Sequence, residues 1–155
     1  MPSAGDTIRA LDFPATAIAE QSTDETGFTS TTYTAGSAVC GVAFVAPTSG
    51  KVRVAWAARF ETNTLNVRVT VSFEMLTGSS VGSGTSVLAA SDSRALESTS
   101  DDASAGNNAR QQAGTFYDVT GLTAGNSYNV RTMHRMSSAG NGDIFDRQIS
   151  VTPLP

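Results

Sequence analysis

Charge is scarce in this chain, and positive charge is the scarcer sign. Only 15% of the 155 residues are charged, against roughly 25% in an average domain, and the formal net charge is −4. Lys51 is the single lysine among ten basic residues. Because phosphate binding requires clustered Lys and Arg, we expect no nucleic-acid partner.

Cysteine, histidine and long apolar runs are also scarce, and each shortage excludes a class of site or of protein. Cys40 is the only cysteine, so no internal disulfide can form, and its apolar neighbours predict a small buried side chain. His134 is the only histidine, which excludes metal sites built from two or three histidines. No stretch approaches the ~20 apolar residues of a membrane helix, and no signal-peptide pattern opens the chain. We expect a soluble protein made in the cytoplasm, without membrane partner, metal or cofactor.

Serine and threonine supply the polar surface instead, with 19 Ser and 20 Thr. Threonine suits a pleated strand and serine suits turns, so this composition favours a β protein. The clearest pattern is at 65–75, where every second residue is apolar, and a period of two places all of these side chains on one face of a strand. The run at 51–61 alternates in the same way. These apolar residues are predicted to form the centre of the core: Val52, Val54, Trp56, Ala58, Phe60, Leu65, Val67, Val69, Val71, Phe73 and Met75.

The remaining strands are expected at 27–34, 38–46, 85–90, 115–119, 127–136 and 144–152, separated by polar loops at 78–84 and 91–114. The 38–46 segment is apolar on both faces, which predicts a central strand. We therefore predict an all-β fold, a single antiparallel β-sandwich of about eight to nine strands with jelly-roll-like connectivity. An N-terminal extended arm at 1–24 precedes the sandwich domain at 25–155.

The arm carries the candidate partner-binding residues. It is polar apart from two small apolar clusters, which an isolated arm would expose to water without benefit. In a groove on a partner they would be buried, with charged neighbours at the rim fixing the register. We predict docking on a partner through these residues: Ile8, Arg9, Leu11, Asp12, Phe13 and Pro14.

One segment matches a catalytic motif in sequence. Residues 78–82 (GSSVG) match the G-x-S-x-G nucleophile elbow around Ser80, and Asp118 and His134 follow in hydrolase order. That chemistry requires a sharp turn from a strand into a helix, and the residues after Gly82 do not begin a helix. We interpret the match as chance in a Ser- and Gly-rich chain and predict no catalytic residues.

The sequence gives weaker signals for two kinds of binding site, a calcium site and a sugar-binding surface. The oxygen-bearing residues of the 91–114 loop (Asp101, Asp102, Asn107 and Asn108) lack EF-hand spacing, so we interpret them as a solvated loop. A sugar-stacking platform would need exposed aromatic residues. Trp56 is in register with the core, which leaves these candidates: Tyr33, Tyr117 and Phe145.

The chain resembles a viral family at both ends and in one turn. Residues 1–14 (MPSAGDTIRALDFP), 46–52 (APTSGKV), 121–130 (GLTAGNSYNV), the His134-Arg135 pair and 151–155 (VTPLP) are similar to short proteins encoded by actinobacteriophages and related prophages. The 121–130 element also occurs in fibronectin-type and other sandwiches, where its tyrosine fills a corner of the core. The resemblance implies a virion-associated sandwich and carries over no catalytic residue.

From this we expect a structural, non-enzymatic component of a bacteriophage virion: a capsid decoration, a fibre or a tail-tip element. Its partners are expected to be other virion proteins and copies of itself, assembled as a trimer. The alternative is a carbohydrate-binding module that recognises host-surface glycans, and the third hypothesis is a small hydrolase.

Overall fold

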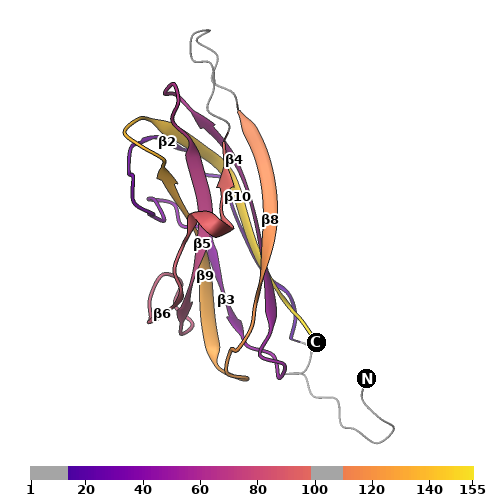
Figure 1. Ribbon diagram of the computed structural model, residues 1–155. Helices are drawn as coiled ribbons and strands as arrows, with labels where there is room; N and C mark the ends of the chain where they lie inside the picture. Colours follow the sequence, from indigo (N-terminus) through magenta and orange to yellow (C-terminus); the bar gives the residue numbers. More distant parts are fainter. Residues whose placement is uncertain (1–13, 99–109) are drawn as a thin grey trace, which may run out of the picture.

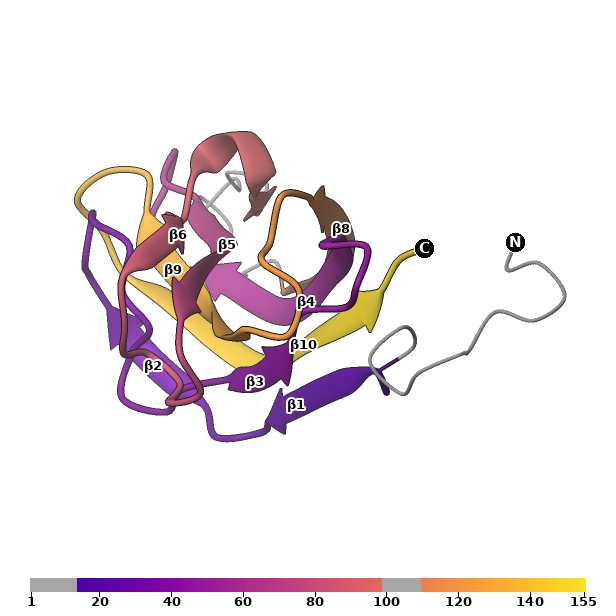
Figure 2. The same cartoon turned by 90° about the horizontal axis from the view of Figure 1, so that it is seen from below.

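Two antiparallel sheets pack face to face in the computed structural model, which describes residues 14–98 and 110–155 (Figures 1 and 2). Within these residues no helix is long and apolar enough to span a membrane. The described residues form ten strands and one short 3-10 helix, η1, with these bounds: β1 Ala17–Gln21, β2 Glu25–Phe28, β3 Gly41–Val45, β4 Val52–Thr62, β5 Val69–Thr77, β6 Ser86–Leu88, η1 Asp92–Arg94, β7 Leu96–Glu97, β8 Gln111–Val119, β9 Ser127–Met136 and β10 Gly142–Pro153.

The connectivity is that of a jelly roll. The first sheet has the order β1-β10-β4-β8, with β2 also paired to β10; the second has the order β3-β9-β5-β6, with β7 also paired to β5. The pairing is nested along the chain: β1 with β10, β3 with β9, β4 with β8 and β5 with β6. In a jelly roll, nested antiparallel strand pairs lie alternately in one sheet and in the other, and these pairs do so. The predicted fold class, an antiparallel β-sandwich with jelly-roll-like connectivity, is confirmed.

The core lies between β4 and β5, as the alternating patterns predict. In β4 the inward residues from Val52 to Phe60 are at most 2% exposed, and the inward residues of β5 are fully buried. Trp56 lies against Phe73, and its indole N–H donates to the carbonyl of Val71 at 3.3 Å. Cys40 is buried, as expected.

The tyrosine of the 121–130 element fills a corner of this core. Tyr128 is 6% exposed, and its hydroxyl accepts a hydrogen bond from the backbone N–H of Thr123 at 3.0 Å. Its ring stacks on Phe44 of β3. The strand predicted at 127–136 coincides with β9.

The strand predicted at 65–75 begins four residues later than expected. Leu65 is 49% exposed, Asn66 adopts a left-handed backbone with φ of 60°, and β5 starts at Val69. The reason is topological: β4 and β5 belong to different sheets, so the chain needs these residues to cross between them. Asparagine tolerates the left-handed region that such a turn requires.

The polar face of β5 is covered, although the alternation predicted that it faces solvent. Thr70 and Ser72 are fully buried. The hydroxyl of Ser72 donates to the carbonyls of Ser91 and Arg94, at 3.1 and 3.3 Å, so that η1 lies over this face. Thr70 pairs with Glu97 of β7.

Further expectations were wrong. The strand predicted at 27–34 is replaced by β2, which ends at Phe28. The segment at 38–46 was predicted to be a central strand, but β3 is an edge strand of the second sheet, and its apolar residues are half-buried beside β1. Residues 17–21 were assigned to the arm, but they form β1, paired with β10 from Ala17 opposite Val151 to Gln21 opposite Arg147. Backbone pairing with a long partner strand holds this segment, whose side chains alone give only a weak pattern. β8 also begins earlier than the predicted 115, at Gln111.

Candidate functional site

Of the six predicted arm residues, only Pro14 belongs to the described part of the chain; Ile8, Arg9, Leu11, Asp12 and Phe13 lie outside it. Pro14 lines an apolar hollow of about 300 Å³ between β1 and β3. Apart from Thr16, the walls of the hollow are apolar residues: Ala15, Ala17, Ala43, Phe44, Val45, Val52, Val151 and Pro153. Pro14, the first described residue, therefore lies at the edge of an apolar opening in the sandwich.

The residues of the elbow motif are separated by the fold. Ser80 lies in the loop after β5 and is exposed. Asp118 lies on the outer face of the first sheet, where Arg53 pairs with it at 2.7 Å. His134 is buried in the sandwich, and its ring lies 4.5 Å from that of Phe28. The arrangement does not form a Ser-His-Asp triad.

The candidate aromatic residues of a sugar-stacking platform are not brought together either. Trp56 belongs to the core, and Phe145 is 5% exposed because the guanidinium groups of Arg59 and Arg110 cover its ring at 5.2 and 4.0 Å. The hydroxyl of Tyr33 donates to Asp92 at 2.7 Å and is thereby bound to η1. Tyr117 is 40% exposed at the sheet edge.

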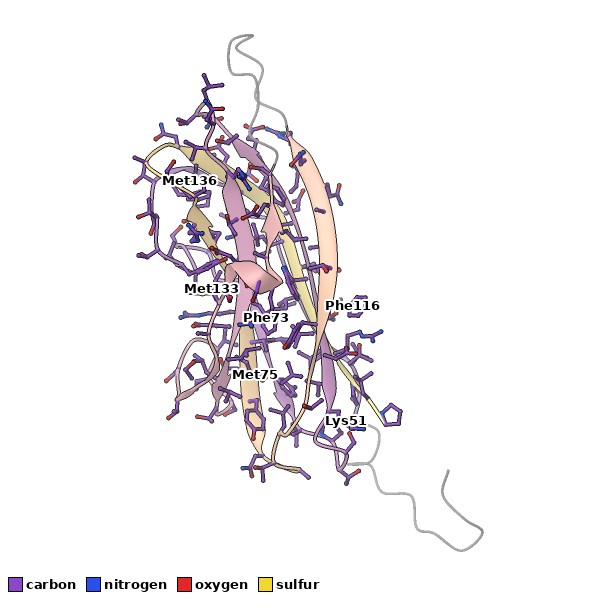
Figure 3. All side chains as sticks on the ribbon, in the orientation of Figure 1. Lys51, Phe73, Met75, Phe116, Met133 and Met136 are labelled. Carbon is purple, nitrogen blue, oxygen red and sulfur yellow. The ribbon has the colours of Figure 1, made fainter. Side chains whose placement is uncertain are left out.

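A face that sequence reasoning missed is the outer side of the first sheet, which we call the outer-face trough. Its floor consists of small side chains that the strand register places side by side: Ala55, Ala57, Gly114 and Ser150. Ile18 of β1 and Phe116 of β8, each 56% exposed, flank this floor on opposite sides. Figure 3 shows Phe116 projecting from β8 away from the second sheet.

The trough contains two hollows, each of about 340 Å³, which share Ala57 and Gln148. Both hollows have polar groups at their margins. Gln148 donates to Glu20 at 2.7 Å, and the guanidinium of Arg53 lies 4.1 Å from the centre of the Phe116 ring. The side chains available for hydrogen bonding come from four strands: Glu20, Arg53, Gln112, Asp146 and Gln148.

This combination suits binding of a polar ligand with one apolar face. The small floor allows close approach to the backbone, Phe116 offers a ring surface, and amide and carboxylate groups offer directional hydrogen bonds. The signal in the sequence was the pair of small outward residues, Ala55 and Ala57, in an otherwise well-patterned strand. Nothing local showed which of Phe116 and Tyr117 would face outward.

A second polar cluster is buried between the sheets. His134 of β9 and the side chain of Arg147 of β10 are almost fully buried, and both approach Glu25 of β2. Nε2 of His134 lies 3.6 Å from Oε1 of Glu25, too far for a hydrogen bond. Arg147 lies 3.5 Å from Glu25 and donates to the carbonyl of Thr23 at 2.9 Å. Gly36 adjoins the cluster, because a Cβ there would overlap the Glu25 carboxylate.

Burial lowers the pKa of His134 to about 4, with a smaller contribution from the charge of Arg147 in the same direction. Glu25 opposes this shift. The imidazole is therefore neutral at pH 7, and the carboxylate of Glu25 faces the buried cation of Arg147. This cluster joins three strands and belongs to the stability of the fold.

No group of three or more His, Cys, Asp or Glu side chains in the described ranges is placed to hold a metal ion. Asp101, Asp102, Asn107 and Asn108 lie outside those ranges. No protein-family model matches this chain, and no curated protein matches it at a significant level.

Proposed function

We propose that this protein is a non-enzymatic structural component of a bacteriophage particle, a capsid decoration, fibre or tail-tip element that docks through its N-terminal arm. The observation that carries the proposal is the structure at the point where the arm joins the sandwich, which we call the arm root. β1 is held in the first sheet by pairing with β10, and Pro14, three residues before its start, lies at an apolar opening. A mechanical force on a docked arm would thus pass through β1 to the central strands of the sandwich.

Two other features support the proposal. The resemblance to actinobacteriophage proteins includes the arm itself, residues 1–14, and the corner element around Tyr128. Jelly rolls are a common architecture of viral capsid proteins, although the same architecture serves lectins and enzymes. On this proposal the protein is part of the virion, and its partners are other virion proteins and copies of itself.

Deletion of residues 1–13 tests the docking role. β1 begins at Ala17, so the truncation leaves every described strand intact, and we expect a folded sandwich with an unchanged unfolding transition. In a phage whose own copy of the gene is deleted, the truncated protein should be missing from purified virions by mass spectrometry. Deletion of residues 1–5 is the matched control, because it retains Ile8, Leu11 and Phe13. Incorporation of both truncations at the wild-type level would refute arm docking.

The outer-face trough favours a second candidate function, recognition of a host-surface glycan. A sugar ring has an apolar face that can stack on Phe116 and hydroxyl groups that can bond Gln148 and Glu20. We expect the protein to bind host envelope polysaccharide in a pull-down assay and Phe116→Ala to weaken binding at least tenfold. Val87→Ala, an exposed apolar residue on β6 of the other sheet, is the control and should have no effect. Absence of binding by the wild-type protein would refute this function.

A further inference from the structure

β8 is an edge strand with an unusual amount of exposed surface. It closes one side of the first sheet and is paired on one side only, with β4, among the described residues; Figure 1 shows it at the margin of the sandwich. It has nine residues, whereas the other strands that pair on one side only, β1, β2, β3, β6 and β7, have five, four, five, three and two. Residues 114–118 are all exposed, including Phe116 on one face and Tyr117 on the other.

Edge strands of soluble proteins are usually protected by lysine, proline, a bulge or a covering segment, because their free N–H and C=O groups can pair with another chain. The sequence of β8, QQAGTFYDV, contains no lysine and no proline. Its register with β4 runs without a bulge from Phe60 opposite Gln111 to Val52 opposite Val119. The strand is therefore regular and long. Among the described residues no other strand pairs with its outer edge, although Arg94 of η1 lies over the Tyr117 ring at 5.3 Å.

The sequence of β8 is complementary to itself. Suppose two copies pair antiparallel about a two-fold axis that runs perpendicular to the sheet and passes beside Thr115. Phe116 then lies opposite the partner's Gly114 on the outer face, and Tyr117 lies opposite the partner's Ala113 on the other face. On both faces the large side chain meets a small one, and an aromatic residue opposite glycine covers the exposed backbone.

Charge also permits this pairing. Asp118 would lie opposite the partner's Gln112, so no like charges oppose one another across the seam. Asp118 is already paired with Arg53 of its own chain, at 2.7 Å, and therefore brings little unbalanced charge to the seam. The two-fold axis keeps the outer faces of both sheets on the same side, so that the two troughs would form one continuous surface.

We propose that β8 pairs with β8 of a second copy about this two-fold axis, which makes the protein a dimer with one sheet continuous across both subunits. Such an interface is isologous and closes at two copies. The inference does not rest on the virion proposal. It differs from the trimer expected from the sequence, and sedimentation distinguishes the two.

Substitution of Thr115 tests the interface, because this residue would face itself across the axis. Its side chain is exposed and lies on the opposite side of β8 from Phe116, so the substitution leaves the outward side chains of the trough unchanged, although Thr115 itself borders one of the hollows. We expect the full-length wild type to sediment as a dimer and Thr115→Asp and Thr115→Lys each to sediment as monomers with a cooperative unfolding transition. An equimolar mixture of the two variants should recover the dimer. Ser86→Asp, on the β6 edge of the second sheet, is the matched control and should remain dimeric.

Cysteine cross-linking tests the register. Because Cys40 is buried, a cysteine introduced on β8 is the only accessible thiol. Under mild oxidation Thr115→Cys should form a disulfide-linked dimer at least tenfold faster than Gln112→Cys, which would face the partner's Asp118. A monomeric or trimeric wild type, a mixture of Asp and Lys variants that stays monomeric, or equal cross-linking at both positions would overturn the proposal.

Discussion

Acid should destabilise this protein through His134. The imidazole is buried against Phe28 and is neutral in the folded state, because burial lowers its pKa to about 4 from the 6.5 of an exposed histidine. Between these two values the unfolded chain binds a proton that the folded chain does not. The contribution of His134 to stability is therefore complete above about pH 6.5 and declines as the pH falls to about 4.

The magnitude follows from the difference between the two pKa values. Each unit corresponds to about 1.4 kcal/mol, so a shift from 6.5 to about 4 corresponds to about 3–4 kcal/mol, of which about 3 is lost by pH 4. Against a total stability of about 5–15 kcal/mol for a typical domain, this loss is large. Burial and the charge of Arg147 both disfavour a protonated imidazole, and among the described residues Glu25 is the acidic neighbour that opposes them.

The assay is urea unfolding at pH 4, 5, 6 and 7, followed by the fluorescence of Trp56, which is the only tryptophan and lies in the core. We compare the wild type with His134→Gln, which is polar and does not titrate in this range. The stability of the wild type should fall by about 3 kcal/mol more than that of the variant between pH 7 and pH 4. Phe28→Leu removes the ring contact but leaves the histidine, so it should retain the wild-type pH dependence. Parallel pH profiles for the wild type and His134→Gln would refute the reasoning.

Three further predictions concern the sandwich. Val69→Asp and Thr70→Asp should both abolish cooperative unfolding by circular dichroism, because both residues are fully buried; a folded Thr70→Asp protein would mean that η1 and β7 do not cover β5. Asn129→Ala should cost about 3 kcal/mol in urea unfolding, since this buried amide accepts from Gly82 and donates to three carbonyls of the 77–83 segment; a cost below about 1 kcal/mol would contradict that role. Ser80→Ala should leave stability and particle incorporation unchanged, and stoichiometric labelling of Ser80 by a fluorophosphonate probe would instead revive the hydrolase hypothesis.

The candidate sites show where sequence reasoning ends. Five of the six arm residues lie outside the described ranges, so their docking role remains a prediction, and Pro14 lies at the arm root where the apolar hollow opens. The outer-face trough was not predicted. Its floor and its flanks come from β1, β4, β8 and β10, and no local pattern places residues so far apart in the sequence next to one another.

The sequence by itself determined the class of the fold and the inward faces of its central strands. Alternation with a period of two is a property of neighbouring residues, so Val54, Trp56, Val71 and Phe73 could be assigned to the core without knowledge of any partner strand. The same reasoning predicted the bounds of β9.

Only the tertiary structure decided what covers the other faces. Thr70 is polar and alternates outward, yet it is buried because β7 returns beside it. His134 becomes a buried neutral base because β2 and β10, more than a hundred residues apart, bring Glu25 and Arg147 to the same point. The physical reason is that strands pair with segments far away in the sequence. The alternating pattern shows to which face of a strand a side chain points, but the neighbours that it contacts there depend on how the whole chain folds.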